Sequence, residues 1–147
     1  MTFKSKFIIL TAVALAGLAL LVFWPAKART QVVIGDVKFD VRMAITPQAR
    51  EQGLSGRTGL GEREGMFFVF DKPDRYAFWM KDMLFAIDIL YIRDGRIVDM
   101  ALNMPPPRAG ETPAVHRPVE SADRVLEVMA GTAQKLGWAK GTRVVCP

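Results

Sequence analysis

The chain has 147 residues, of which 50% are hydrophobic and 24% charged, with one cysteine and one histidine. This length and composition suit a single domain with a hydrophobic core and exclude an intrinsically disordered chain. A single cysteine excludes an internal disulfide framework and a cysteine-based zinc site, and a single histidine excludes a multi-histidine metal centre. We therefore predict no metal and no cofactor, and the sequence contains no complete catalytic motif.

The first 28 residues have the pattern of a targeting segment. Lys4 and Lys6 precede an apolar run of 18 residues (7–24), and Ala26-Lys27-Ala28 fits the small-x-small pattern that a signal peptidase reads. The run is longer than the apolar part of a usual signal peptide, and it is at the short end for a membrane anchor. Two interpretations stay open: residues 1–28 are a cleaved signal peptide, or they are an N-terminal membrane anchor whose hydrophobic helix spans residues 7–24.

Both interpretations place the remaining domain, residues 29–147, outside the cytoplasm, either periplasmic, secreted or held at the inner membrane. Without residues 1–28, which hold three lysines and no acidic residue, the net charge falls from +5 to +2. The remaining basic residues are scattered among acidic ones, whereas nucleic-acid binding needs a basic stripe on the folded domain. We therefore predict no nucleic-acid partner, and we expect a monomer.

The exported part begins with a predicted β-hairpin and a short helix. Residues 31–34 and 37–43 are rich in β-branched side chains, are joined by a Gly-Asp turn, and alternate apolar with polar residues in the second run. Thr46 is a typical N-cap before Pro47 at the first helical position, which predicts a helix over residues 47–52 that ends at Gly53.

The middle of the chain alternates predicted loops and strands. Residues 53–65 contain five glycines and predict a loop, and the continuous apolar run 66–70 predicts a strand buried on both faces. Residues 71–74 predict a turn, and residues 75–81 predict another strand.

The second half begins with another predicted hairpin. Strands over 87–92 and 96–102 flank an Asp-Gly pair, which is a strong hairpin signal. Residues 105–118 hold five of the nine prolines and predict a long loop, of a length that is usually functional or mobile.

The last three predicted elements lie beyond this loop: a strand favoured over a helix at 121–129, a short helix at 131–138 and a closing strand at 142–145. Together, the elements predict a mainly β fold (β-rich α+β). We expect a single compact β-sandwich-like or half-barrel domain with two short helices, preceded by the N-terminal hydrophobic helix.

The densest unusual cluster is Phe78-Trp79-Met80-Lys81-Asp82. In a strand, Phe78 and Met80 point to one side while Trp79 and Lys81 point to the other. One face can then belong to the core while the other presents an aromatic ring beside an ammonium group. This arrangement suits a ring-bearing or anionic ligand, although a packed Trp79 and a solvated Lys81 would produce the same pattern.

Two acidic residues lie in the otherwise apolar stretch 78–92. Asp88 stands between two isoleucines, where an uncompensated carboxylate is costly, so we expect it to accept backbone hydrogen bonds or to pair with Arg50, Arg57 or Lys81. A role of Asp88 or Asp82 as a general acid or base is the alternative.

Arg50 and Arg57 flank the first glycines of the 53–65 loop. Arginines beside a glycine-rich loop can bind carboxylates or phosphates through bidentate contacts, or they can anchor the loop. No phosphate-loop motif is present, since the Gly-Lys-Ser/Thr ending is missing. His116 and Cys146 lack an orienting residue, so we predict no catalytic dyad.

Several motifs resemble, in order, those of a small prokaryotic family known as domain of unknown function 192. They are Glu51-Gln-Gly-Leu-Ser-Gly-Arg57, Glu64-Gly-Met-Phe-Phe-Val-Phe70, Phe78-Trp-Met-Lys-Asp-Met83, Ile87-Asp-Ile-Leu-Tyr-Ile92, Asp94-Gly-Arg-Ile-Val98 and Val125-Leu-Glu-Val with Ala130-Gly131. The resemblance covers about residues 32–145. Family members often carry Asn-Thr where this chain has Asp82-Met83, and Pro where it has Ala86. The resemblance implies a compact β-sandwich-like or half-barrel domain, frequently behind a signal peptide or anchor, with no assigned activity.

Three function hypotheses follow. The first is a non-catalytic domain that binds a small polar or anionic ligand near Arg57, Trp79, Lys81 and Asp88, with Arg50 nearby. The second is an accessory or assembly factor that docks a protein of the cell envelope. The third is an enzyme that uses Asp88 or Asp82 in acid/base chemistry, although no nucleophile–base pair accompanies them and no catalytic residue is assigned.

Overall fold

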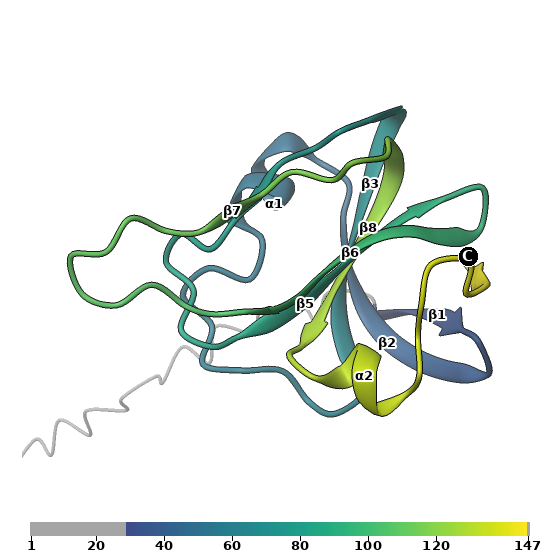
Figure 1. Ribbon diagram of the computed structural model, residues 1–147, viewed down its shortest axis with the longest axis horizontal. Coiled ribbons are helices and arrows are strands. Elements are labelled where there is room, and N and C mark those ends of the chain that lie inside the picture. The colour runs from purple at the N-terminus through teal and green to yellow at the C-terminus, as the bar shows by residue number, and fades with distance from the viewer. Residues whose placement is uncertain (1–28, 147) are drawn as a thin grey trace, which may run out of the picture.

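The computed structural model describes residues 29–146, so the predicted N-terminal hydrophobic helix lies outside the described residues. Within them, the chain forms nine strands and two short helices (Figure 1). The elements are β1 (Arg29–Ile34), β2 (Val37–Ala44), α1 (Pro47–Gln52), β3 (Glu64–Asp74), β4 (Phe78–Trp79), β5 (Ile87–Arg93), β6 (Arg96–Met104), β7 (Val115–His116), β8 (Ala122–Met129), α2 (Thr132–Lys135) and β9 (Val144–Val145).

Seven strands form one strongly curled sheet in the order β6-β5-β8-β3-β2-β1-β9. All neighbours are antiparallel except β2 and β3, which run parallel through the connection that contains α1. The segment before β9 reaches the opposite edge of the sheet, where Ile97 N donates to Thr142 O at 3.0 Å and Gly141 N donates to Ile97 O at 2.8 Å. The sheet is therefore a half-barrel, which is one of the two predicted architectures, the other being a β-sandwich. The fold is mainly β with two short helices.

The local signals placed the hairpins and the first helix correctly. The β5–β6 turn has both Asp94 (φ 51°) and Gly95 (φ 67°) in the left-handed region, as a type I′ turn requires. Helix α1 has the predicted bounds: the Thr46 hydroxyl accepts a hydrogen bond from Ala49 N at 3.1 Å, and Gly53 ends the helix at φ 50°. Strand β8 settles the choice over residues 121–129 in favour of a strand.

Other boundaries differ from the predictions. The turn predicted at 71–74 is the exposed end of β3, which continues through Pro73 and pairs again with β8 at Asp74–Ala122. The strand predicted at 75–81 is limited to Phe78–Trp79, because within residues 29–146 it pairs only with the short strand β7 inside the proline-rich loop. That loop is therefore anchored in its second half. Helix α2 and strand β9 are also shorter than predicted.

Two hydrophobic clusters lie on the two faces of the curled sheet. The cluster on the concave face takes residues from all seven strands and is plugged by Trp138, whose ring packs edge-on against Phe39 at 5.3 Å between centroids. The cluster on the convex face lies under α1 and the β4–β7 pair and includes Phe68, Phe78 and Tyr91. The candidate site is built over this convex cluster.

Candidate functional site

Trp79 is an exposed aromatic ring on a two-residue strand. In β4, Phe78 points into the convex cluster and is 9% exposed, whereas Trp79 points outward and is 51% exposed. Met80 is fully buried, so the alternation predicted for the Phe-Trp-Met stretch is present. A tryptophan that leaves half of its surface in solvent retains stacking area that the core does not use.

Lys81 lies against the same ring, and the turn that follows is held by the loop after α1. The Lys81 ammonium is 5.1 Å from the Trp79 ring centroid. The Ser55 hydroxyl donates to Lys81 O at 2.9 Å, and Gly56 N donates to Asp82 O at 2.8 Å. Asp82 has φ 55°, a left-handed conformation that asparagine and aspartate adopt more readily than other side chains. The residue type at position 82 thus fits the turn that orients Lys81.

A pocket of about 360 Å³ opens between α1 and this turn. We call it the Trp79 pocket; it is lined by Gln48, Glu51, Gln52, Ser55, Trp79, Lys81 and Asp82. The side chains supply two amides, two carboxylates, one hydroxyl and one ammonium around an indole ring. The pocket therefore offers many hydrogen-bonding groups together with a local excess of negative charge.

On its other side, Trp79 borders an aromatic hollow of about 250 Å³. Phe70 and Tyr76 lie in its wall as a stacked pair, with ring centroids 3.7 Å apart. Trp79 and Glu51 line both, so the indole separates the polar Trp79 pocket from the aromatic hollow.

Arg50 has a structural task. Its Nη1 donates to Ile45 O at 2.8 Å and to Val69 O at 2.9 Å, and its guanidinium lies 5.1 Å from the Phe70 ring centroid. These contacts tie α1 to β3, so the loop-anchoring alternative describes Arg50 better than ligand binding does. Arg50 still lines the aromatic hollow beside Trp79.

Arg57 lies in an adjacent hollow of about 250 Å³ with Met43 and Met66 in its wall. This hollow shares Gln52 and Ser55 with the Trp79 pocket. The structure thus places Arg57 beside the Trp79 pocket rather than in its wall.

Asp88 lies on the other face of the sheet. Its neighbours Ile87 and Ile89 belong to the convex cluster, so Asp88 points to the concave side, away from Trp79. It is fully buried, and its two carboxylate oxygens accept hydrogen bonds from Asn103 N at 2.8 Å and Ala133 N at 3.0 Å. The expected backbone hydrogen bonds are present, and Asp88 holds the start of α2 to the sheet rather than joining the other candidate residues.

Glu127 is a residue that the sequence analysis missed. It lies on β8 between Met66 of β3 and Ile89 of β5, on the convex face, and it is only 5% exposed. Its Oε2 has no hydrogen-bond partner among the described residues, and burial raises the pKa of the carboxyl to about 8. The signal was available, since Glu127 interrupts the apolar run 125–129 as Asp88 interrupts the run before it.

Glu127 lines a cavity of about 30 Å³ beneath Trp79. Aromatic rings of Phe68, Phe78 and Trp79 form part of its wall, together with Met83 and residues of α1. Four of its lining residues (Glu51, Gln52, Ser55 and Trp79) also line the Trp79 pocket. This volume exceeds the roughly 10–15 Å³ needed for one water molecule, so the cavity has room for a single small polar group.

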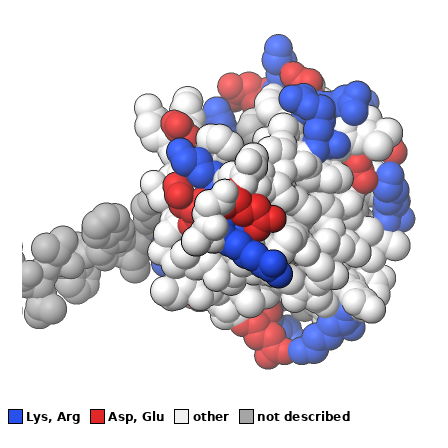
Figure 2. All heavy atoms as spheres, turned by 60° about the vertical axis from the view of Figure 1, so that its left-hand side comes forward, with Lys and Arg blue, Asp and Glu red and all other residues white. Residues whose placement is uncertain are grey.

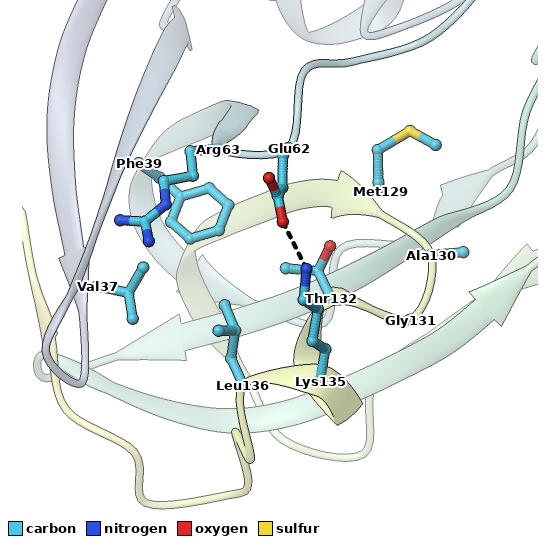
Figure 3. A pocket seen from close by; sticks show the side chains of 10 residues that line it. All are labelled: Val37, Phe39, Glu62, Arg63, Met129, Ala130, Gly131, Thr132, Lys135 and Leu136. Carbon is cyan, nitrogen blue, oxygen red and sulfur yellow. Dashed lines mark hydrogen bonds and ion pairs between the residues drawn. The ribbon is translucent and has the colours of Figure 1, made fainter.

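A further pocket of about 310 Å³ lies elsewhere, between β2 and α2 (Figure 3). Its wall includes Val37, Phe39 and Leu136, and Lys135 Nζ donates to the Glu62 carboxylate across it. The Lys135 hydrogen bond and charge lower the pKa of Glu62. Besides this ion pair, the pocket holds the cation Arg63 and several apolar side chains, so it offers fewer hydrogen-bonding groups to a neutral polar ligand than the Trp79 pocket does.

Two further findings concern residues 29–146. No helix there is long and apolar enough to cross a membrane, and no group of three or more histidine, cysteine or acidic side chains is placed to hold a metal ion. On the face shown in Figure 2, the basic side chains are interspersed with acidic ones.

Comparison with known proteins places the chain among uncharacterised relatives. The model of the family DUF192, described as Uncharacterized ACR, matches residues 30–146. None of the curated proteins matches the chain.

Two solved structures are similar. A protein from Sinorhizobium meliloti 1021, provisionally named a transcription regulator, has a TM-score of 0.75 and 30% identity and covers 82% of this chain and 95% of its own. A protein of unknown function from Novosphingobium aromaticivorans DSM 12444 has a TM-score of 0.69 and 32% identity and covers 78% of this chain and 83% of its own.

Proposed function

The chain belongs to the DUF192 family, which carries no assigned activity, and we propose from its own site that the domain binds a small polar, ring-bearing ligand in the Trp79 pocket. One observation carries the proposal: a half-exposed tryptophan forms one wall of a 360 Å³ pocket whose other walls are hydrogen-bonding side chains. Small-molecule sites usually occupy about 300–1,000 Å³.

The charges of the pocket favour a neutral or cationic ligand over an anion. Glu51 and Asp82 contribute two carboxylates against the single ammonium of Lys81. A phosphate or carboxylate would meet this negative excess, whereas hydroxyl groups can donate to the carboxylates and accept from Lys81 and the amides. We therefore narrow the ligand to a polyhydroxylated ring, whose apolar face stacks on Trp79.

The first test is a thermal-shift titration of residues 29–147 against neutral sugars, amino sugars and sugar phosphates. A ligand at a hundred times its Kd adds about 2.7 kcal/mol to stability, and this raises the melting temperature by several degrees. We expect shifts from neutral or amino sugars, and a stronger response to sugar phosphates would contradict the proposed charge preference.

The matched variants are Trp79→Ala and Trp79→Phe. We expect Trp79→Ala to weaken binding about tenfold or more, because a stacked aromatic contact contributes about 0.5–1.5 kcal/mol beyond its burial. Trp79→Phe keeps a ring and should retain most of the affinity. Undiminished binding by a folded Trp79→Ala variant would eliminate the site.

A second function, docking of an envelope protein, is favoured by one specific observation. Val115 of β7 pairs directly with Trp79 of β4, and both side chains are exposed. An apolar pair in solvent is a feature of protein-binding surfaces. A Val115→Glu variant should bind small ligands like the wild type, so a loss of cellular function in that variant alone would identify the pair as a protein contact.

We also propose that the domain acts outside the cytoplasm, on the strength of the residue pattern in segment 1–28. Expression of the full chain followed by cell fractionation and N-terminal sequencing tests this. A mature N-terminus near residue 29 indicates a signal peptide, and an intact chain in the membrane fraction indicates an anchor. An intact chain in the cytoplasmic fraction would contradict both.

A further inference from the structure

The cavity beneath Trp79 has the chemistry of a site for a cation. Its wall combines two acidic residues, the buried Glu127 and Glu51 of α1, with the aromatic residues Phe68, Phe78 and Trp79, and it also includes Arg50. A carboxylate attracts a cation by its charge, and an aromatic face does so by its quadrupole.

One oxygen of the Glu127 carboxyl lacks a hydrogen-bond donor. Its Oε2 accepts no hydrogen bond from the described residues, although the residue is 5% exposed. Arg50, the cation of α1 at this cavity, directs its Nη1 to two backbone carbonyls and lies against Phe70. A buried carboxyl oxygen without a hydrogen-bond partner lowers the stability of the folded domain. A ligand that donates a hydrogen bond to this oxygen removes that cost, and the recovered free energy contributes to its affinity.

We infer that Glu127 binds a primary ammonium group of the ligand that occupies the Trp79 pocket. The inference rests on the proposed function of that pocket and specifies its ligand as a ring-bearing polar molecule with an amino group, such as an amino sugar. An ammonium group has about the size of the single water molecule that the cavity can hold, and its three N–H donors match a carboxylate acceptor.

Charge balance requires a proton to leave when the ammonium enters. In the free domain at neutral pH, burial keeps the carboxyl of Glu127 protonated, with its pKa at about 8. Binding of an already protonated amine converts Glu127 to the carboxylate, and the carboxyl proton passes to the buffer. Below the free-state pKa, the affinity should therefore rise about tenfold for each pH unit.

The other charged and titratable groups around Glu127 are few. Helix α1 contributes Arg50 and Glu51 to the cavity wall, and the rest of the wall from β3 and β4 consists of apolar and aromatic side chains. From β5, Tyr91 feels the Glu127 charge, but burial, the larger cause, raises its pKa far above neutral. From β7, which pairs with β4, His116 lies against Tyr91, with ring centroids 5.6 Å apart. Because Glu127→Gln keeps His116, a pH dependence between pH 6 and 7 that disappears in this variant is attributed to Glu127.

The decisive comparison uses glucosamine and glucose, which differ by an amino group in place of a hydroxyl. Calorimetric titration between pH 6 and 7, in two buffers of different ionisation enthalpy, measures both affinity and proton release. We expect glucosamine to bind at least tenfold more tightly than glucose, with release of about one proton and an affinity that rises with pH. Equal affinities for the two sugars, or no proton release, would overturn the inference.

The variant Glu127→Gln separates this inference from the proposed function. It should bind glucosamine and glucose equally and release no proton, whereas Trp79→Ala should weaken both sugars. Glucosamine selectivity retained in Glu127→Gln would overturn the ammonium site alone. Failure of both sugars to bind the wild type would overturn the amino-sugar assignment.

Methylammonium tests the cavity without any ring. At equal ionic strength, methylammonium chloride should raise the melting temperature of the wild type more than sodium chloride does, and the difference should vanish in Glu127→Gln. The same shift in both proteins would show a general salt effect and would count against the site. Glu120→Gln, at an exposed position that lines neither the cavity nor the Trp79 pocket, is the matched control and should keep the shift.

Discussion

At the scale of single residues, two buried carboxyl groups in similar sequence contexts differ in their hydrogen bonding. Asp88 and Glu127 both interrupt apolar strands, and both are buried in the fold. Asp88 accepts two backbone hydrogen bonds, whereas Glu127 keeps an oxygen without a partner. The first stabilises the fold, and the second lowers its stability in a place where a ligand can offset the loss.

This contrast predicts the pH dependence of stability. The folded-state pKa of Glu127 is about 8 against an ordinary value of 4.5, so the folded state holds the proton more tightly. Its contribution to stability is present below about pH 4.5 and is lost as the pH rises to about 8. Glu127→Gln, which carries no titratable proton, should have a flatter profile and should exceed the wild type at pH 8 by a few kcal/mol, as a rough magnitude.

Urea denaturation at several pH values measures this difference. Glu120→Gln is the control, because Glu120 is exposed and its substitution should leave the pH profile unchanged. Parallel profiles for the wild type and Glu127→Gln would show that Glu127 is not perturbed in the folded domain.

At the scale of elements, the close pairing of β3 with β8 requires glycine at position 65, because the neighbouring strand leaves no room for a side chain. A Cβ at Gly65 would lie 2.8 Å from Glu127 O and 3.0 Å from Leu126 Cδ1. Backbone atoms cannot move aside cheaply, so only glycine permits this approach. The strand that carries Glu127 is therefore fixed closely against β3.

We expect Gly65→Ala to destabilise the domain by about 1–3 kcal/mol, because the two strands must separate to admit the methyl group. Gly59→Ala is the matched control, since a Cβ there meets nothing within 4 Å. It should leave stability unchanged or raise it by up to about 1 kcal/mol. Chemical denaturation of the two variants compares them, and an equal effect in both would contradict the close contact.

Elements with strong local signals were predictable from the sequence. The N-cap and the terminal glycine fixed α1, and the two hairpins follow from alternation and turn residues. The short elements were harder, because β4 and β7 exist only by pairing with each other across 36 residues. A two-residue strand leaves no periodic pattern that local reasoning can detect.

At the scale of the whole molecule, Asp99 joins three segments that are distant in sequence. From β6, its carboxylate accepts hydrogen bonds from Val119 N at 2.7 Å and Met100 N at 2.9 Å, and it lies 3.4 Å from the Lys140 ammonium. Burial alone would raise the pKa of Asp99, but these donors and this charge together lower it. The segment that follows the proline-rich loop and the segment before β9 are thus held to the same strand.

We expect Asp99→Asn to lose about 1–3 kcal/mol of stability at pH 7, because an amide nitrogen replaces one acceptor oxygen. The pKa of Asp99 is lowered in the folded state, so its contribution is present above an ordinary pKa of 3.8 and is lost as the pH falls through the folded-state value. The two proteins should therefore converge in acid.

Thermal or urea unfolding between pH 3 and 7 measures the effect of Asp99→Asn. Asp71→Asn, at an exposed position on β3, is the control and should change stability little. A constant difference between Asp99→Asn and the wild type down to pH 3 would contradict the electrostatic explanation.

The sequence by itself determined the mainly β class and the family, because alternation and local turn chemistry act between near neighbours. It left open whether Trp79 is packed or exposed, and the structure shows that the side chain is half exposed. Only the tertiary structure decided which candidates share a site. Asp88 lies on the opposite face of the sheet, and Arg50 donates its hydrogen bonds to backbone carbonyls. Glu127, which is 48 residues away from Trp79 in sequence, lines the cavity beneath it. The physical reason is that strand order and sheet curvature are set by burial over the whole chain, and no local pattern records them.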